Sequence, residues 1–474
     1  MGRRWGGAGP ADFSHMSVLL LSRLQFALTI TFHYLYPPLS IGLGILLVVI
    51  EALWLITRNP LYHQMARYWT KVFALTFAIG VATGIVMEFE FGTNWATYSR
   101  YVGDVFGSAL AAEGIFAFFL ESGFLAVLLF GWDKVGPKMH FFSTCMVALG
   151  AHFSAVWIVV ANSWMQTPAG FHIVGTGLNA RAEVTDFWAM VFNPSSMQRL
   201  SHTLSGAWQA GAWLMVSVGA WYLLRRRHRE FALASVRIGL AFALFASLLT
   251  LLTGHKSAEG VAKNQPEKLA AFEGLYVTRT HAPLTLFGWV DAKNEKTHGY
   301  AIPGLLSWLA HGKTSAKVTG LNETAPADRP PVNFTFQLFH LMVAVGFTMI
   351  GLALWAVWAL WRGSLERSRV LLWLMTFAVL GPQIANQAGW WAAEVGRQPW
   401  IVYHLLKTSA ALSAVVTANE VVASMVMFSL VYMLLFAVFV FLLNDKIQHG
   451  PDDSDLNPAG KWALGFGLKS KGAK

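Results

Sequence analysis

Cysteine and charged residues are scarce in this chain of 474 residues. The single cysteine, Cys145, lies within an apolar stretch, which excludes disulfides, thiolate-ligated clusters and thioether-linked haem. Charged residues make up 13% of the chain and hydrophobic residues 55%, with 21 Trp and 34 Phe, whereas a soluble protein has about 25% charged residues. The composition therefore predicts an integral membrane protein that crosses the bilayer several times.

Nine apolar stretches are long enough to cross a bilayer as helices. They cover residues 24–56, 70–93, 109–131, 140–163, 201–224, 232–254, 334–361, 370–395 and 420–443. Spanning strands would be shorter and would alternate in polarity, so the sequence predicts an all-α fold and not a barrel. The expected parts are an N-terminal extension (1–23), helices one to six (24–254), a long loop (255–333), helices seven to nine (334–443) and a tail (444–474). Arg3 and Arg4 are not followed by the apolar core of a secretory signal.

The positive charges predict the orientation of the chain in the membrane. Lys and Arg are concentrated in the loops after the first, third, fifth and seventh stretches, and Arg225, Arg226 and Arg227 are examples. Loops rich in Lys and Arg stay in the cytoplasm, so the N-terminus and the 255–333 loop should be outside and the tail inside. The net charge of +10 reflects this signal and suits an acidic lipid surface, and nothing in the sequence points to nucleic acid.

Polar residues at membrane depth are the strongest functional signal, because each costs on the order of 3 kcal/mol near the bilayer centre. Glu113 and Glu121 are eight residues apart, which is about 80° around a helix. The predicted topology gathers five candidates near the outer face and leaves Glu121 deeper. These five are His33, Glu113, His202, Met342 and Glu394.

Each candidate also has a purely structural interpretation. His and Met are haem ligands, but a buried His is more often a hydrogen-bonded packing residue. Glu394 and Arg397, three residues apart, are equally well explained as an ion pair. Glu113 and Glu121 could be a proton relay or two protonated hydrogen-bond donors. The residues alone leave these alternatives open.

Several long motifs resemble subunit I of the cytochrome bd-type quinol:oxygen oxidases. They are "LSRLQFALTITFHYLYPPL", "GVATGIVMEFEFGTNW", "EGIFAFFLES", "LFGWDKVG", "NSWMQTP" and "AGWWAAEVGRQPW". The similarity runs in order through residues 18–445. It implies an oxidase that takes electrons from quinol at the outer face and reduces oxygen to water with cytoplasmic protons, generating membrane potential without pumping.

The resemblance implies three haem groups and their ligands. His202 and Met342 match the two ligands of a low-spin haem b, while His33 and Glu394 match the ligands of the two high-spin haems, one b and one d. It leaves open which high-spin haem sits on which ligand, and whether haem b replaces haem d. Trp390 matches a tryptophan that lies among the haems.

Other residues match the proton route and the quinol site of the family. Glu113 and Glu121 match carboxylates on the route to the oxygen-reducing haem, and Glu88 matches a glutamate near the high-spin pair. Lys268 and Glu273 match residues of the quinol-binding loop, which here is 255–333. Glu273 is the expected acceptor of the quinol proton.

The sequence departs from the family at two informative places. His340 stands where many members have an arginine near the low-spin haem, so a group that can be neutral replaces a fixed cation. The resemblance places His340, and Arg397 beside Glu394, among the expected cofactor-binding residues. The 255–333 loop also lacks the long insertion of some members, which indicates the short-loop, cyanide-insensitive-type branch.

The resemblance implies a multi-pass protein of the bacterial inner membrane that works with a second multi-spanning subunit. A small single-span subunit and the identity of the quinone stay open. Two alternatives remain from the residues alone. A secondary transporter would explain the buried carboxylates, although no inverted repeat is visible, and a haem-bearing quinol dehydrogenase would need only His202 and Met342.

Overall fold

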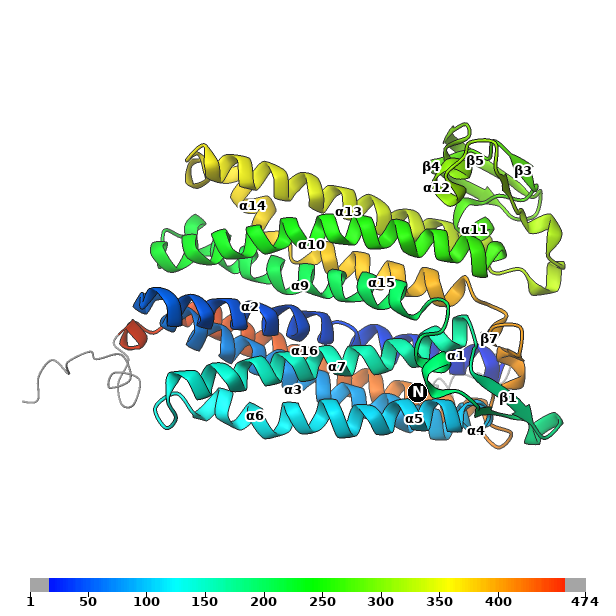
Figure 1. Ribbon diagram of the computed structural model, residues 1–474, viewed down its shortest axis with the longest axis horizontal. Coiled ribbons are helices and arrows are strands. Elements are labelled where there is room, and N and C mark those ends of the chain that lie inside the picture. The colour runs from blue at the N-terminus through cyan, green and yellow to red at the C-terminus, as the bar shows by residue number, and fades with distance from the viewer. Residues whose placement is uncertain (1–16, 457–474) are drawn as a thin grey trace, which may run out of the picture.

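The computed structural model describes residues 17–456 as a long bundle of helices with a small domain at one end (Figure 1). The predicted extension 1–23 and tail 444–474 lie partly outside the described residues. Eight helical segments in the described part are long and apolar enough to cross a membrane. They are Val18–Thr57 (α1 and α2), Pro60–Thr93 (α3), Gly103–Phe130 (α5, η2 and α6), Pro137–Gln166 (α7), Arg229–Asn264 (α10), Val332–Trp361 (α13), Arg369–Val395 (α14 and α15) and Ala418–His449 (α16).

The remaining predicted stretch, 201–224, lies in helix α9 (Ser196–Leu224). This helix has 29 residues, enough to cross, but its Ser, Gln and Trp residues make it less apolar than the eight. The prediction of an all-α membrane protein is confirmed, with short strands added at one end of the bundle.

Proline sets the start of several helices. Helices α2 (Pro37–Thr57), α3, α7 and α11 (Pro266–Glu273) each begin with Pro at the first helical position, where the missing N–H costs nothing. Pro37 and Pro38 accompany a full break in the first apolar stretch, because α1 (Val18–His33) ends at His33 and α2 begins at Pro37.

Two other spanning segments are interrupted. The third consists of α5 (Gly103–Glu113), a π-helical turn η2 (Gly114–Phe118) and α6 (Phe119–Phe130). The eighth is divided into α14 (Arg369–Phe377) and α15 (Leu380–Val395). Breaks of this kind are frequent at functional sites.

The helices form two layers (Figure 1). Helices α9, α10, α13, α14 and α15 pack together, as do α2, α3, α6 and α7, and α2 joins the layers by packing on α9. Where α2 crosses α9, a Cβ atom on Gly42 or Gly211 would collide with the backbone of the other helix. Glycine is thus required for this close approach. Helix α16 packs at the side, on α1 and α3.

Short elements connect the helices. The strands are β1 (Phe171–Val174), β2 (Arg181–Val184), β3 (Arg279–Thr280), β4 (Leu284–Asp291), β5 (Lys296–Ile302), β6 (Lys317–Val318), β7 (Trp400–Val402) and β8 (Leu406–Lys407), paired antiparallel as β1–β2, β3–β6, β4–β5 and β7–β8. The short helices are α4 (Ala96–Tyr101), α8 (Phe187–Val191), α12 (Leu305–His311), η3 (Gly177–Asn179), η4 (Leu321–Glu323), η5 (Pro326–Asp328), η6 (Leu365–Arg367), η7 (Thr408–Ala410) and η8 (Asp453–Leu456).

The loop predicted at 255–333 is a folded domain, and its first boundary was wrong. Helix α10 (Arg229–Asn264) continues to Asn264 because Gln265, which precedes Pro266, is the first residue that leaves the helical conformation. The domain then contains α11, β3 to β6 and α12, around a core that includes Leu269, Tyr276 and Leu321.

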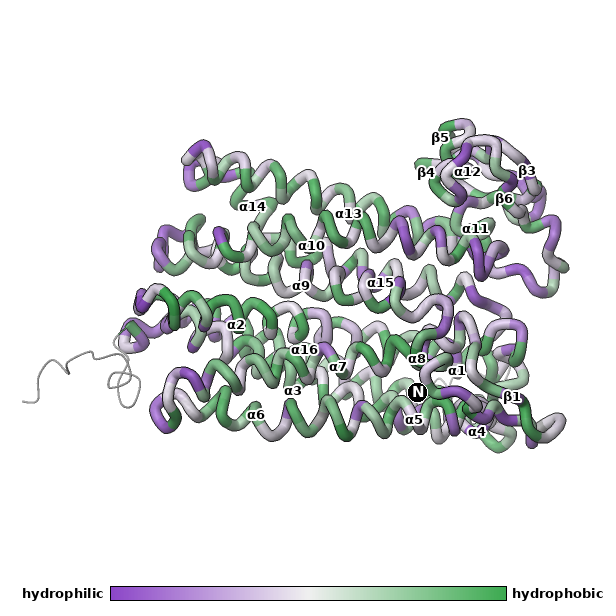
Figure 2. The backbone as a smooth tube through the Cα atoms, viewed as in Figure 1, coloured by the Kyte–Doolittle hydropathy of each residue, from purple (hydrophilic) through white to green (hydrophobic). Residues whose placement is uncertain are grey.

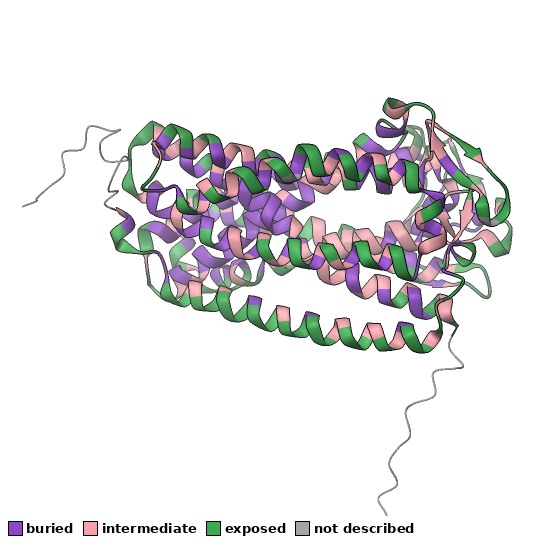
Figure 3. Cartoon of the chain, turned by 90° about the horizontal axis from the view of Figure 1, so that it is seen from below, coloured by how far each residue is buried: buried purple, intermediate pink, exposed green. Residues whose placement is uncertain are grey.

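Hydropathy and burial differ along the bundle. Apolar residues dominate the middle of the helices, and polar residues gather at both ends (Figure 2). Buried residues are concentrated in one half of the bundle (Figure 3). A large cluster of buried apolar side chains includes Trp54, Trp69 and Trp213. In contrast, the candidate residues His33, His202, Met342 and Glu394 are only half-buried although they lie inside the bundle.

Candidate functional site

His33, at the end of α1, is held by a threonine on α3. Its Nδ1 lies 2.9 Å from the Thr83 hydroxyl, and that hydroxyl donates to the backbone oxygens of Ile79 and Gly80 at 2.9 and 3.1 Å. With its one proton on these backbone oxygens, the hydroxyl accepts a hydrogen bond from His33 Nδ1–H. The lone pair of His33 is therefore on Nε2, the tautomer that a metal-ligating histidine needs.

His202, on α9, has the same arrangement. Its Nδ1 lies 3.3 Å from the hydroxyl of Thr253 on α10, and Thr253 donates to the Leu249 oxygen at 2.9 Å. The hydroxyl again accepts from the imidazole, which leaves Nε2 as the free base. The structure thus builds two equivalent His–Thr pairs from four different helices.

A glycine on a neighbouring helix faces three of the four candidate ligands. A Cβ atom on Gly84 would lie 3.2 Å from His33 Cε1, and one on Gly254 would lie 3.1 Å from His202 Cε1. A Cβ atom on Gly389 of α15 would lie 2.6 Å from the Met342 sulfur. Larger residues at these positions would occupy the space beside the rings and the sulfur.

Glu394, near the end of α15, lies in a network of donors. Its Oε1 accepts from Asn162 at 3.2 Å and from Gln166 at 3.1 Å, both on α7, while Oε2 accepts from Arg397. The predicted ion pair with Arg397 is confirmed. Within the described residues, Oε2 accepts from Arg397, and a carboxylate oxygen with one donor keeps a lone pair for a further partner.

Basic groups outnumber acidic ones around Glu394. Arg199 lies 3.9 Å from Glu394 Oε1 and donates to Asn162, and Lys268 donates to Gln166 and Gln265. Burial, followed by the charge of Arg199, holds the pKa of Lys268 well below its usual value. Even with Lys268 neutral, two guanidinium groups face one carboxylate.

Two polar groups in this network also lack partners. Among the described residues, the buried Nε atoms of Arg199 and Arg397 have no hydrogen-bond acceptor. Unpaired buried N–H groups beside surplus positive charge fit an anionic ligand, and the propionates of a haem are such a group. The imidazoles of His33 and His202 and the sulfur of Met342 are of the kinds that bind haem iron, whereas iron binding by Glu394 is implied by the family resemblance alone.

Helix α7 supplies a partner for carboxylates at several depths. His140 and Thr144 bind Glu51 of α2 at 3.1 and 2.7 Å. Glu51 was not among the residues predicted from the sequence. Further along α7, Ser154 donates to Glu113 at 2.5 Å. Asn162 and Gln166 then reach Glu394. The signal that could have found Glu51 is its place within the apolar run "LLVVIEALW".

The π-helical turn alters the predicted angle between Glu113 and Glu121. The turn η2 lies between the two residues and absorbs an extra residue, so the offset of about 80° falls to about 20° in the other direction. Glu121 is buried, and its Cγ lies against Gly150 of α7. The two carboxylates therefore share a face more closely than a regular helix would allow.

Glu88 has a different environment from the neighbouring Glu90. Glu88 is exposed in this chain, although its charge is close enough to repel that of Glu113. Glu90 is buried and accepts from Thr29 at 2.6 Å. The spacing in "VMEFEF" could not tell which glutamate points inward.

Helix α15 also holds the break after His33. Gln383, Gln387 and Trp391, on one helical face, donate to Leu35 O, Thr31 O and the Thr31 hydroxyl at 3.1, 2.8 and 2.9 Å. Trp390 lies with its ring centroid 5.8 Å from that of Tyr34. The eighth spanning segment thus contacts the His33 turn as well as carrying Glu394.

The predicted quinol residues are both buried. Lys268 is 2% exposed and points into the Glu394 network, while Glu273 is 4% exposed. Within the described part of the chain, Glu273 Oε2 has no hydrogen-bond partner. Burial raises the pKa of Glu273 to about 8. The two residues therefore have separate environments, as their spacing on the helix predicts.

His340 bonds to backbone oxygens. Its Nε2 lies 2.7 Å from the Thr285 oxygen of β4, and its Nδ1 lies 2.8 Å from the Phe336 oxygen. The ring thereby fastens the domain that follows α10 to α13, whereas the match to the family's arginine suggested only a contact with haem. Its expected contact with a haem stays a prediction.

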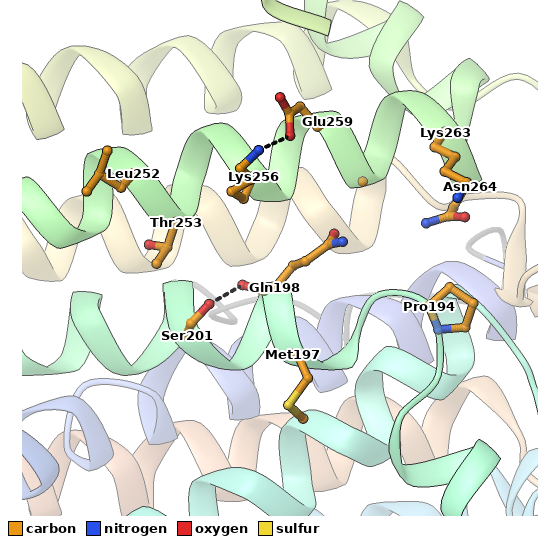
Figure 4. Close-up of a pocket in the computed structure, with 11 residues that line it drawn as sticks. Pro194, Met197, Gln198, Ser201, Leu252, Thr253, Lys256, Glu259, Lys263 and Asn264 are labelled. Carbon is orange, nitrogen blue, oxygen red and sulfur yellow. Dashed lines mark hydrogen bonds and ion pairs between the residues drawn. The ribbon is translucent and has the colours of Figure 1, made fainter. Parts of the chain in front are cut away.

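A cleft of about 630 Å³ opens between α9 and α10 beside His202 (Figure 4). Its lining includes Ser201 and the His202 partner Thr253. Lys256 and Glu259, which form an ion pair at 2.8 Å, lie further along α10 in the same cleft. The cleft thus joins an ionisable pair to the neighbourhood of a candidate ligand.

Comparisons with known proteins agree with these features. Residues 21–451 match the family described as cytochrome bd terminal oxidase subunit I. The chain is 41% identical to the cytochrome bd ubiquinol oxidase subunit 1 of Bacillus subtilis (strain 168), over 92% of this chain and 95% of the relative. It is 36% identical to the cytochrome bd-II ubiquinol oxidase subunit 1 of Escherichia coli (strain K12), over 92% and 97%. The structure of a bd oxidase from Geobacillus thermodenitrificans superposes with a TM-score of 0.86 at 30% identity, covering 93% of this chain and all of that one.

Proposed function

The chain belongs to the family of cytochrome bd terminal oxidase subunit I, and from this premise we propose that it oxidises a quinol at its outer face and reduces oxygen to water. His202 and Met342 would hold a low-spin haem, and His33 and Glu394 the two high-spin haems. Haem, when bound, supplies the electron transfer and the chemistry of oxygen. A second multi-spanning subunit completes the enzyme in the bacterial inner membrane.

The observation that carries the proposal is the pair of histidines held by threonines. Each histidine has its Nδ1 beside a threonine hydroxyl, a contact that favours the tautomer with the free lone pair on Nε2. The surplus of buried positive charge around Glu394 gives independent support, because a haem brings two negative propionates.

The chain's own residues would manage the protons. Glu273 is the proposed acceptor of the quinol proton, since it is buried, its Oε2 has no hydrogen-bond partner among the described residues, and burial raises its pKa to about 8. The cleft beside His202 is a candidate entrance for quinol. Glu121 of α6 and then Glu113 of α5, whose side chains both face α7, would carry protons from the cytoplasmic side. Charge is then separated without a pump, because protons leave outside and are consumed from inside.

A reduced-minus-oxidised absorption spectrum of the purified complex tests the proposal. We expect b-type bands from the His202–Met342 haem, with a far-red band in addition if haem d is present. Quinol-dependent oxygen consumption should accompany them. A complex that carries no haem would refute the proposal, and one with low-spin haem alone would reduce it to a quinol dehydrogenase.

A further inference from the structure

The β4–β5 hairpin has an aromatic face that lies open in this chain. Phe287, Trp289 and Tyr300 are 66%, 60% and 59% exposed. The strand register places Phe287 opposite Tyr300 and Trp289 opposite His298, and the rings of Phe287 and Tyr300 stack at 5.9 Å. Large exposed aromatic patches mark an interaction surface.

The hairpin is fastened along the outer end of α13. Val290 N donates to Asn333 Oδ1 at 3.0 Å, and Gln337 donates to the Gly288 oxygen at 2.8 Å. His340, a further turn along, binds the Thr285 oxygen. Asn333, Gln337 and His340 share one helical face, and seven residues of helix measure about 10 Å. Strand β4 therefore runs beside the first turns of α13, with its Thr285 end about 10 Å further along the helix than its tip.

The other end of α13 indicates where the membrane lies. Trp358 and Trp361 are 56% and 78% exposed there, and the Arg362 guanidinium lies 5.9 Å from the Trp358 ring. Exposed Trp beside Arg is typical of a membrane–water interface. A hydrocarbon layer of about 30 Å takes about 20 helical residues, which leads from Trp358 to about residue 338. The opposite interface thus lies between Gln337 and His340, beside Thr285 and Gly288.

Polarity along the hairpin follows the same direction. Phe287, Tyr300 and Ile302 are exposed near the Thr285 end, whereas the tip carries the exposed Lys293 and Lys296. Figure 1 shows this domain standing beside the outer end of α13. We infer that the β4–β5 hairpin rests in the outer lipid–water interface, with Phe287, Trp289 and Tyr300 against lipid and its lysine tip in water. An open strand edge could not enter the hydrocarbon itself, so the hairpin can lie no deeper in the membrane than the lipid–water interface.

Site-specific fluorescence of the whole complex in lipid nanodiscs tests this inference. In a Cys145→Ser background, the fluorophore NBD is attached at Trp289→Cys or at Tyr300→Cys, and Asn294→Cys at the tip serves as the matched control. Quenching is measured with lipids that carry a nitroxide on the headgroup and with aqueous iodide.

We expect lipid quenching to exceed iodide quenching by about twofold or more at 289 and 300, and the reverse at 294, because interfacial aromatics lie at headgroup depth. Iodide quenching at 289 and 300 equal to that at 294 would place the face in water. Protection of 289 and 300 from both quenchers would mean that a protein, such as the second subunit, covers the face. Either result would overturn the inference.

Discussion

The side chain of Gln166 joins Lys268 to Glu394. Its amide oxygen accepts from the Lys268 amine, and its amide nitrogen donates to Glu394 Oε1 at 3.1 Å. A residue of the domain that follows α10 and a proposed haem ligand therefore share Gln166 of α7 as a partner. A change at Gln166 should act on both.

Replacement Gln166→Ala should remove one hydrogen bond from Lys268 and one from Glu394, at about 1–3 kcal/mol each, although Gln265 and Arg397 remain as their partners. We expect a lower midpoint of thermal denaturation for the solubilised complex and a changed high-spin haem spectrum. The exposed Gln448 offers a control, since Gln448→Ala removes only a surface amide. An unchanged haem spectrum in the Gln166 variant would contradict the assignment of Glu394 as a haem ligand.

Replacement Met342→Leu should convert the low-spin haem to a high-spin form or lose it, because leucine fills the volume but cannot bind iron. Optical and electron paramagnetic resonance spectra would report the change. Met349→Leu, at a buried position of the same helix, should keep the low-spin signal. A normal low-spin signal in the Met342 variant would remove Met342 as a ligand.

Replacement Thr253→Val should remove the hydrogen bond that holds His202 in the tautomer with its lone pair on Nε2, because valine cannot accept from Nδ1–H. Loss of such a support typically weakens metal binding about 10- to 100-fold, so haem content should fall. The midpoint potential should rise, because the imidazole becomes a weaker base and stabilises oxidised iron less. Thr253→Ser restores the acceptor and should restore both values. Equal haem content in the valine and serine variants would assign Thr253 to packing alone.

Replacement Glu273→Gln should depress quinol oxidation by about 10²- to 10⁴-fold, because glutamine cannot take a proton. The pKa of Glu273 is raised to about 8, so the accepting carboxylate predominates only above that pH. Turnover of the unmodified enzyme should therefore rise with pH through about 8, and the variant should lose this rise.

Two measurements separate this role from structural damage. Oxygen reduction driven by an artificial donor to the haems should persist in the Glu273 variant, and Glu323→Gln, at an exposed position of the same domain, should change neither activity. If the pH profile is the same with and without Glu273, another group accepts the proton. Lys268→Ala, expected from the loop resemblance to raise the quinol KM, should instead disturb the Glu394 network that it contacts.

The sequence predicted the helical stretches and the candidate residues because both depend on local signals. Apolar length identifies a span, and a histidine or carboxylate within it stands out by its cost. The break after His33 was also predictable, because Pro37 and Pro38 follow it directly.

The partners of those residues were not predictable. Thr83 and Thr253 lie on other helices, about fifty residues away from His33 and His202, and threonine is common in apolar helices. Glu51 and Gln387 were missed for the same reason, since only packing shows what they face. The fold of the domain that follows α10 was not predictable, because its strands are short and its core is made from segments far apart in the sequence.

One helix, α7, sets the spacing of the buried acids. Its residues His140, Ser154 and Asn162 each bind a carboxylate from a different neighbouring helix. The rise of this single helix therefore determines the distances between Glu51, Glu113 and Glu394 along the bundle. An insertion or deletion in α7 would displace every contact beyond it by about 100° and 1.5 Å. Substitutions can therefore vary the acids one at a time, but a change of length in α7 alters all those downstream at once, and the length of this helix should be among the least variable features of the chain.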